Sequence, residues 1–413
     1  MAQSIDGYAL DTSHVSERAY PGLWKLRLAL GWTSLFANLV GLFAVSWDAQ
    51  WHTAVGRDRT LTAPHLFILG SALVMGLAAV AAVLIETAWA RRNPPVATYG
   101  TRFAGFFSSS LGAYLIGFGA LDAAVSFPLD QYWHTLYGVD LTFWAPFHIM
   151  LAVGFCVSTL GAAYMLAEGT HLATQQGAKG AAWVGYAGMI LAFATLMGWF
   201  TYLVMPALST GYVSLANLTV TVYPLMLGAF GTFVLMMARR VLPGLPAATS
   251  VAVVYLFFGL VNYLIVPPLM TLNLRLEQQN MLPGAPTVSL AAMQWQYSLI
   301  LAAVLLDLAV WLAQRKGGTV RKSNRMMLSA VLIGLSLAVL FSPSFLTSAQ
   351  RYSNPLAAGA TAVGSMVGQA RTDLRPTNVV VIVGVSLLLG LLGIVVGNWF
   401  SAGIGESMRR KER

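Results

Sequence analysis

Long apolar segments separated by short polar stretches are the feature that most limits what this chain can fold into. Ten such segments lie at about 24–46, 65–89, 103–126, 146–168, 181–205, 212–238, 247–270, 290–314, 325–342 and 377–400. A helix of about 20 residues crosses the ~30 Å hydrocarbon core of a bilayer. Only 9% of the residues are charged, against about 25% in soluble domains. The sequence therefore predicts an all-α, polytopic transmembrane helical bundle of about ten spans and excludes an ordinary soluble enzyme.

The distribution of Lys and Arg predicts the orientation of these spans. Of the 24 Lys and Arg residues, 18 fall in the N-terminal segment, the loops after every second span and the C-terminal tail, and 6 fall in the other loops. Cytoplasmic loops carry the excess of positive charge in membrane proteins. We therefore expect both termini on the cytoplasmic side of a bacterial or archaeal cytoplasmic membrane. The basic clusters act as topology signals, and no nucleic-acid partner is implied.

Two segments at the outer ends of the first four spans repeat each other. Residues 47–65 and 129–148 align at a constant offset of 82, until one inserted residue, Phe147, displaces the last histidine. The repeated unit is a helical hairpin that occurs twice in the same orientation. This predicts an N-terminal segment over 1–23, hairpin repeats over 24–96 and 97–180, a six-span bundle over 181–400 and a basic tail over 401–413.

The repeated segments concentrate residues that bind metals. They hold four of the six histidines, and a single cysteine excludes a Cys-rich zinc or iron–sulfur site. Asp48 and His52 share a helix face if the first span continues past Ser46, and His65 follows Pro64, which favours a helix start. Two imidazoles and one carboxylate suit copper, zinc or non-haem iron and leave coordination positions open. The second copy supplies Asp130, His134 and His148.

Other repeated residues surround these candidate ligands. Asp58 and Asp140 would orient a histidine N–H, or Asp58 would pair with Arg57; alternatively, both acids are turn formers in exposed loops. Trp51 and Trp133 precede the first histidine of each copy, where an aromatic belt at the membrane surface also explains them. The alternative to metal binding is that the loops are duplicated structure with polar caps.

The segment from Asp48 to His65 resembles a membrane-embedded subunit of the copper membrane monooxygenases, the particulate methane and ammonia monooxygenases. The family motif in that subunit is Asp-x3-His-x12-His, with Trp before the first histidine and Arg-Asp between the two. The first copy matches each of these over about 18 residues. The second departs from the pattern, with Val139 at the arginine position and thirteen residues between its histidines.

The resemblance implies that the chain is a distant relative of this family subunit and not the subunit itself. It also implies that Asp48, His52 and His65 bind copper. It also implies an electron donor and other membrane or cupredoxin-type subunits beside the lipid bilayer. A homo-oligomer is compatible with the sequence. Three functions stay open: oxidation of a small apolar substrate with O₂, uptake or transfer of copper or zinc, and a non-catalytic subunit whose metals fix the hairpins.

Two acids farther along the hairpins also match at the offset of 82, Glu86 and Glu168. Glu86 precedes Arg91 and Arg92, so we expect a solvated pair at the cytoplasmic surface. Alternatively, the two acids form an inner metal or proton station together with His171.

Overall fold

The computed structural model describes residues 21–55, 61–137, 144–204, 212–215, 218–242, 246–283, 299–315 and 379–410. Ten helices lie within this part of the chain: α1 (Pro21–Val55), α2 (Ala63–Arg92), α3 (Pro94–Ala97), α4 (Leu111–Tyr137), α5 (Pro146–Gln175), α6 (Lys179–Val204), α7 (Tyr223–Val241), α8 (Ala247–Glu277), α10 (Leu299–Arg315) and α14 (Val379–Arg410). Eight of them are long and apolar enough to cross a membrane. The prediction of an all-α protein with many spans is confirmed.

Two short antiparallel hairpins interrupt the helices. One pairs β1 (Thr101–Phe103) with β2 (Phe107–Ser109), and the other pairs β3 (Tyr212–Leu215) with β4 (Leu218–Thr221). Each occupies the start of a segment predicted as a span, so the helices begin later than expected, at Leu111 and at Tyr223. The apolar β-branched residues of β3 and β4 explain the second error, because they raise hydropathy without favouring a helix.

Two further predicted spans fall partly or wholly outside the described residues. Of the predicted span over 290–314, the structure describes the 17-residue helix α10 from Leu299 onward. The predicted span over 325–342 lies outside the described residues. The division into two hairpin repeats and a six-span bundle stays a prediction.

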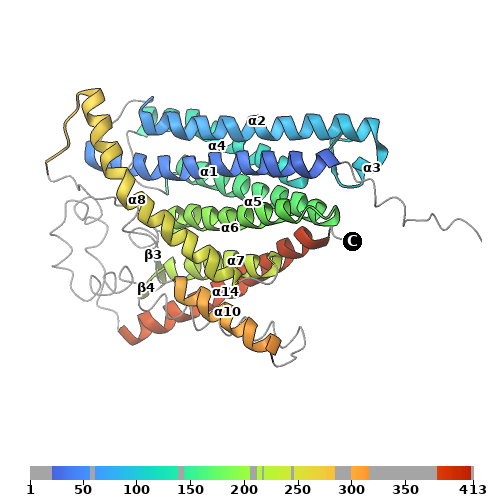
Figure 1. Cartoon of the computed structure of the whole chain (residues 1–413). Coiled ribbons are helices and arrows are strands. Elements are labelled where there is room, and N and C mark those ends of the chain that lie inside the picture. Colours follow the sequence, from blue (N-terminus) through green and yellow to red (C-terminus); the bar gives the residue numbers. More distant parts are fainter. Residues whose placement is uncertain are drawn as a thin grey trace, which may run out of the picture.

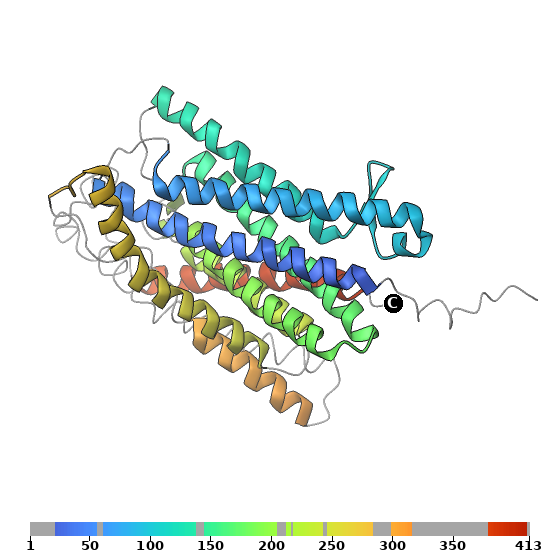
Figure 2. The same ribbon diagram turned by 45° about the horizontal axis from the view of Figure 1, so that its top comes forward.

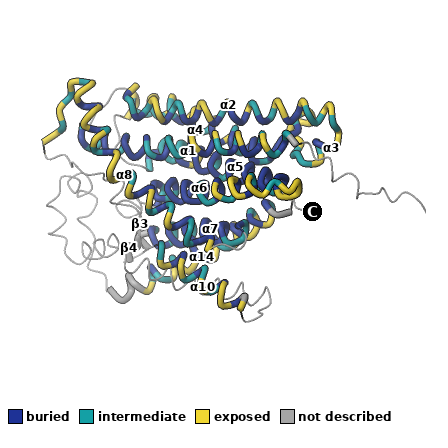
Figure 3. The backbone as a smooth tube through the Cα atoms, viewed as in Figure 1, coloured by how far each residue is buried: buried dark blue, intermediate teal, exposed yellow. Residues whose placement is uncertain are grey.

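The helices α1, α2, α4, α5 and α6 lie side by side, with α7 and α14 packed together beside α6 (Figures 1 and 2). Burial is densest where these helices meet, and exposed segments recur along α2, α8 and α10 (Figure 3). Large apolar side chains such as Leu73, Phe257 and Trp311 are exposed on these three helices. Such surfaces suit a lipid environment, in which apolar side chains face outward.

Helices α4 and α5 touch through their backbones at two glycine pairs. A Cβ added at Gly161 would lie 2.7 Å from the Gly112 carbonyl oxygen, and one added at Gly154 would lie 2.7 Å from the Gly119 carbonyl oxygen. Real Cβ atoms do not approach backbone so closely, so only glycine permits this spacing. Small residues allow membrane helices to pack in this way. The contact fixes the two helices that carry the second Asp-His-His set.

We expect Gly161→Ala to lower the free energy of unfolding by about 2 kcal/mol, because overpacking forces the backbones apart. Gly180→Ala in α6 is the matched control, since its added Cβ would meet no atom within 4 Å and alanine favours a helix. Thermal unfolding of the purified proteins in the same detergent measures both. Equal melting temperatures for the two variants would contradict the close backbone contact.

Candidate metal centres

The first Asp-His-His set lies where α1 ends and α2 begins. His65 Nε2 is 3.1 Å from Asp48 Oδ1, and His52 Nε2 is 3.6 Å from Asp48 Oδ2. The two imidazole rings stand 6.0 Å apart between centroids. Both histidines therefore turn the same nitrogen toward one carboxylate, as a shared ligand would require.

The local sequence explains this arrangement. Helix α1 continues past Ser46 to Val55, so Asp48 and His52 are one helical turn apart on one face. Pro64 stands in the first turn of α2 and places His65 at its start. These expectations from the sequence are confirmed by the helix bounds.

The second set repeats the geometry between α4 and α5. His134 Nε2 is 3.1 Å from Asp130 Oδ2, and His148 Nε2 is 3.5 Å from Asp130 Oδ1. The ring centroids of the two histidines are 6.2 Å apart. The extra residue in this copy, Phe147, packs against Trp133 with ring centroids 6.0 Å apart. The insertion leaves the convergence of the three side chains intact.

The donor atoms of each set fit a metal ion in number, type and spacing. Within each set, one atom from each of the three residues lies within 4.8 Å of the other two. Nitrogen and oxygen ligands about 2.0–2.2 Å from a transition metal stand within about 4.4 Å of each other. A small movement of the side chains therefore converts either set into a three-ligand site. Without a metal, the same contacts are Asp–His ion pairs.

The two sets are neighbours within the bundle. The ring of His65 contacts Phe127 of α4 with centroids 5.5 Å apart, and Phe127 lies one turn before Asp130. Each aspartate also has an electrostatic interaction with a histidine of the other set. Asp48 interacts with His148, and Asp130 interacts with His65. The contact between α2 and α4 therefore brings together centres that are far apart in the sequence.

The tryptophans of the two copies have different surroundings. Trp51 is fully buried in a cluster with Val266 and Met270 of α8. Trp133 is partly buried, and its ring lies near that of Tyr137 with centroids 4.4 Å apart. The other residues predicted around the ligands, Arg57, Asp58 and Asp140, lie outside the described residues.

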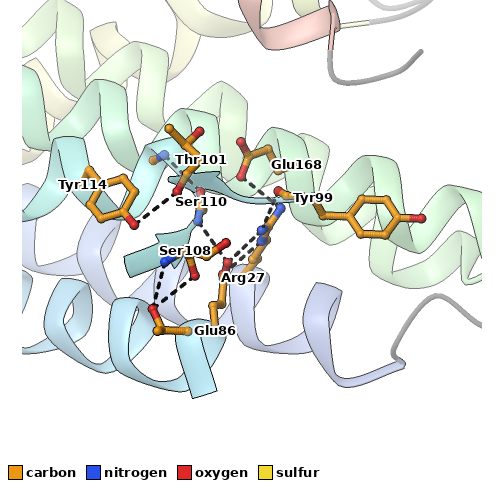
Figure 4. Close-up of polar contacts among 10 residues, drawn as sticks. Arg27, Glu86, Tyr99, Thr101, Ser108, Ser110, Tyr114 and Glu168 are labelled. Atoms are coloured by element: carbon orange, nitrogen blue, oxygen red, sulfur yellow. Dashed lines mark hydrogen bonds and ion pairs between the residues drawn. The ribbon is translucent and has the colours of Figure 1, made fainter. Parts of the chain in front are cut away.

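At the other end of these helices, Glu86 and Glu168 contradict the prediction of a solvated pair. Glu86 is 2% exposed and Glu168 is 6% exposed, and both contact the buried Arg27 of α1 (Figure 4). Arg91 and Arg92, the partners expected from their position in the sequence, are exposed. Sequence reasoning missed Arg27, although a charge inside an apolar segment was a usable signal.

Arg27 contacts the two acids through three of its nitrogen atoms. Its Nε donates to Glu86 Oε1 at 3.0 Å and its Nη2 to Glu86 Oε2 at 2.8 Å, a bidentate pair. Nη1 lies 3.2 Å from Glu168 Oε2. Nη2 also donates to the Tyr99 carbonyl, and the backbone N–H of Ser110 donates to Glu86 Oε2. We call Arg27, Glu86 and Glu168 the arginine cluster. It joins α1, α2 and α5.

Comparisons with known proteins add no assignment, because no family model, curated protein or solved structure matches the chain. The chain is therefore a multispan membrane protein with two Asp-His-His sets that could hold metal ions.

Proposed function

We propose that the protein binds copper at both Asp-His-His sets and oxidises a small apolar molecule with O₂ as part of a membrane complex. The observation that carries the proposal is the duplicated convergence of two imidazoles and one carboxylate at the same end of the helices. The motif's likeness to that of the copper membrane monooxygenases favours copper over zinc or iron and favours oxidation over transport.

The chain's own residues would hold the metal and leave room for a reactant. Asp48 would supply negative charge, and His52 and His65 would supply neutral nitrogen ligands from two different helices. Three protein ligands leave coordination positions open, which distinguishes a reactive site from a closed structural one. Bound copper would supply one-electron chemistry with O₂. The electrons would come from a reduced partner, which the proposal includes.

An apolar groove between α1 and α2, the two helices that carry the first set, supports an apolar substrate. A cavity of about 470 Å³ lies between α1 and α2, lined by Phe36 and Val40 on one side and by Phe67, Gly70 and Val74 on the other. Its lining starts one residue after His65, at Leu66. A molecule dissolved in the bilayer can enter such a groove without first crossing water. We propose this groove as the place where an apolar substrate of the oxidation would bind.

We expect Gly70→Leu to lower the rate of substrate oxidation about tenfold without changing the metal content, because the new side chain fills the groove. An added Cβ at Gly70 would meet no atom within 4 Å, so the change should not disturb the fold. Gly384→Leu in the span of α14 is the matched control, with equally open space. Equal rates for both variants would remove the groove from the proposal.

The proposed function is tested by O₂ consumption in membranes that contain the copper-loaded protein, a reductant and a short-chain alkane. We expect alkane-dependent consumption that His52→Ala abolishes. Stoichiometric copper without oxidation of any apolar substrate would contradict the enzyme hypothesis. A structural metal is the second candidate, because each set joins two consecutive helices. It predicts that His52→Ala lowers the melting temperature as strongly as it lowers any activity.

A further inference from the structure

A second cavity lies at the end of the bundle away from the metal centres, where α5, α6, α7 and α14 meet. It has a volume of about 280 Å³, and its polar lining comes from Thr170, His171, Thr174, Tyr186 and Arg240. His171 and Arg240 are the basic side chains of this lining, and none of the lining residues is an aspartate or glutamate. The charge of the lining therefore favours an anion.

The guanidinium of Arg240 is fixed at this cavity by α14. Its Nη2 donates to Asn398 Oδ1 at 2.8 Å, and its Nη1 donates to the Asn398 carbonyl at 3.1 Å and to the hydroxyl of Ser401. These three acceptors are uncharged, and together they set the orientation of the guanidinium. A guanidinium held in this way is suited to bind a phosphate oxygen.

Two further side chains that line the cavity, His171 and Tyr186, can donate a hydrogen bond. The amide nitrogen of Gln175 lies 2.8 Å from His171 Nε2; because an amide nitrogen only donates, neutral His171 carries its proton on Nδ1. The phenol of Tyr186 makes no hydrogen bond to the residues that the structure describes, and its side chain is partly exposed. Thr170 and Thr174 donate instead to carbonyls of their own helix. Arg240 thus brings positive charge to the cavity, and His171 and Tyr186 bring groups that can donate a hydrogen bond.

We propose that this cavity binds the phosphate group of an anionic lipid. Phosphate oxygens match the positive charge of Arg240 and can accept hydrogen bonds from His171 and Tyr186. The helix ends here belong to the side that the Lys and Arg distribution predicts to be cytoplasmic, where anionic headgroups concentrate. The sequence after Met408, which lines the cavity, continues with the basic Arg409 and Arg410. The lipid would bridge α5 and α6 to α7 and α14.

The test is the rise in melting temperature of the detergent-purified full chain on addition of phosphatidylglycerol, phosphatidylcholine or inorganic phosphate. We expect phosphatidylglycerol to stabilise the protein and phosphatidylcholine to have no effect. Arg240→Gln should need about tenfold more phosphatidylglycerol for half-maximal stabilisation, since it removes a charged hydrogen-bond donor. Arg91→Gln, an exposed arginine at the same end and outside the cavity, should behave like the parent.

Arg240→Gln also loses contacts to α14, so the measured quantity is the lipid-dependent rise and not the starting melting temperature. Tyr186→Phe keeps those contacts and should weaken the lipid effect by itself. Equal stabilisation by both lipids, or an unchanged response in Arg240→Gln and Tyr186→Phe, would overturn the site. Stabilisation by inorganic phosphate alone would overturn the lipid as its source.

Discussion

The parent protein, purified after growth with copper, is expected to hold two metal ions per chain, and His52→Ala is expected to retain one. The reason is that each set draws its ligands from its own helix pair. Substitution of a residue that only hydrogen-bonds to a metal ligand already lowers metal affinity by about 10–100-fold. Loss of a direct ligand should therefore cost at least about 100-fold. His134→Ala should give the same stoichiometry through loss of the other ion.

His171→Ala is the matched control, because it removes a histidine at the opposite end of α5. Metal analysis of all three variants and the parent, with protein quantified by amino-acid analysis, gives the stoichiometry. No stoichiometric metal in folded, copper-supplied parent would mean that the Asp–His contacts are ion pairs only. Loss of both ions from a single variant would mean that the neighbouring sets form one shared centre.

Arg27→Met is expected to lower the free energy of unfolding by about 3–5 kcal/mol, the cost of removing one partner from a buried ion pair. The variant would leave Glu86 and Glu168 buried together without their guanidinium. Glu86→Gln should lower the free energy of unfolding by less, because the remaining charges of Arg27 and Glu168 cancel. Charge balance therefore predicts that Arg27→Met is less stable than Glu86→Gln. Unfolding in mixed micelles with increasing dodecyl sulfate measures it.

Arg91→Met is the control for the arginine cluster, since Arg91 is exposed at the same end of α2. It should leave stability within about 0.5 kcal/mol of the parent. If Arg27→Met were equally harmless, the cluster would contribute nothing to holding α1, α2 and α5 together. If Glu86→Gln were the more damaging change, geometry and not charge balance would govern the cluster.

Local signals allowed much of the geometry of the first Asp-His-His set to be predicted. The spacing from Asp48 to His52 and the proline before His65 act within one or two helical turns, so the sequence alone indicates their convergence. The same signals hold for Asp130, His134 and His148 despite the inserted Phe147. Apolar segment length likewise predicted most helices, and failed where β3 and β4 occupy apolar sequence.

Contacts between distant helices could not be predicted in this way. Glu86 has two exposed arginines nearby in the sequence, yet its partner is Arg27, 59 residues away. That choice depends on how α1 and α2 rotate about their axes, which no spacing rule gives. The neighbouring position of the two Asp-His-His sets has the same origin, because it follows from the packing of α2 against α4. Burial of Trp51 depends on Val266 and Met270 of α8, which lie more than two hundred residues after it in the chain.

The arginine cluster also bears on how the chain is made. Helix α1 leaves the ribosome before α2 and α5, so Arg27 approaches the bilayer before Glu86 or Glu168 has been synthesised. Glu86 becomes available with the second helix, so α1 and α2 can enter the membrane as a charge-matched hairpin. Glu168 follows only with α5, after α4 has been synthesised. A nascent chain whose synthesis stops before α5 would form the ion pair between α1 and α2 but would lack the contact of Arg27 with Glu168. We expect membrane quality-control proteases to degrade such a chain.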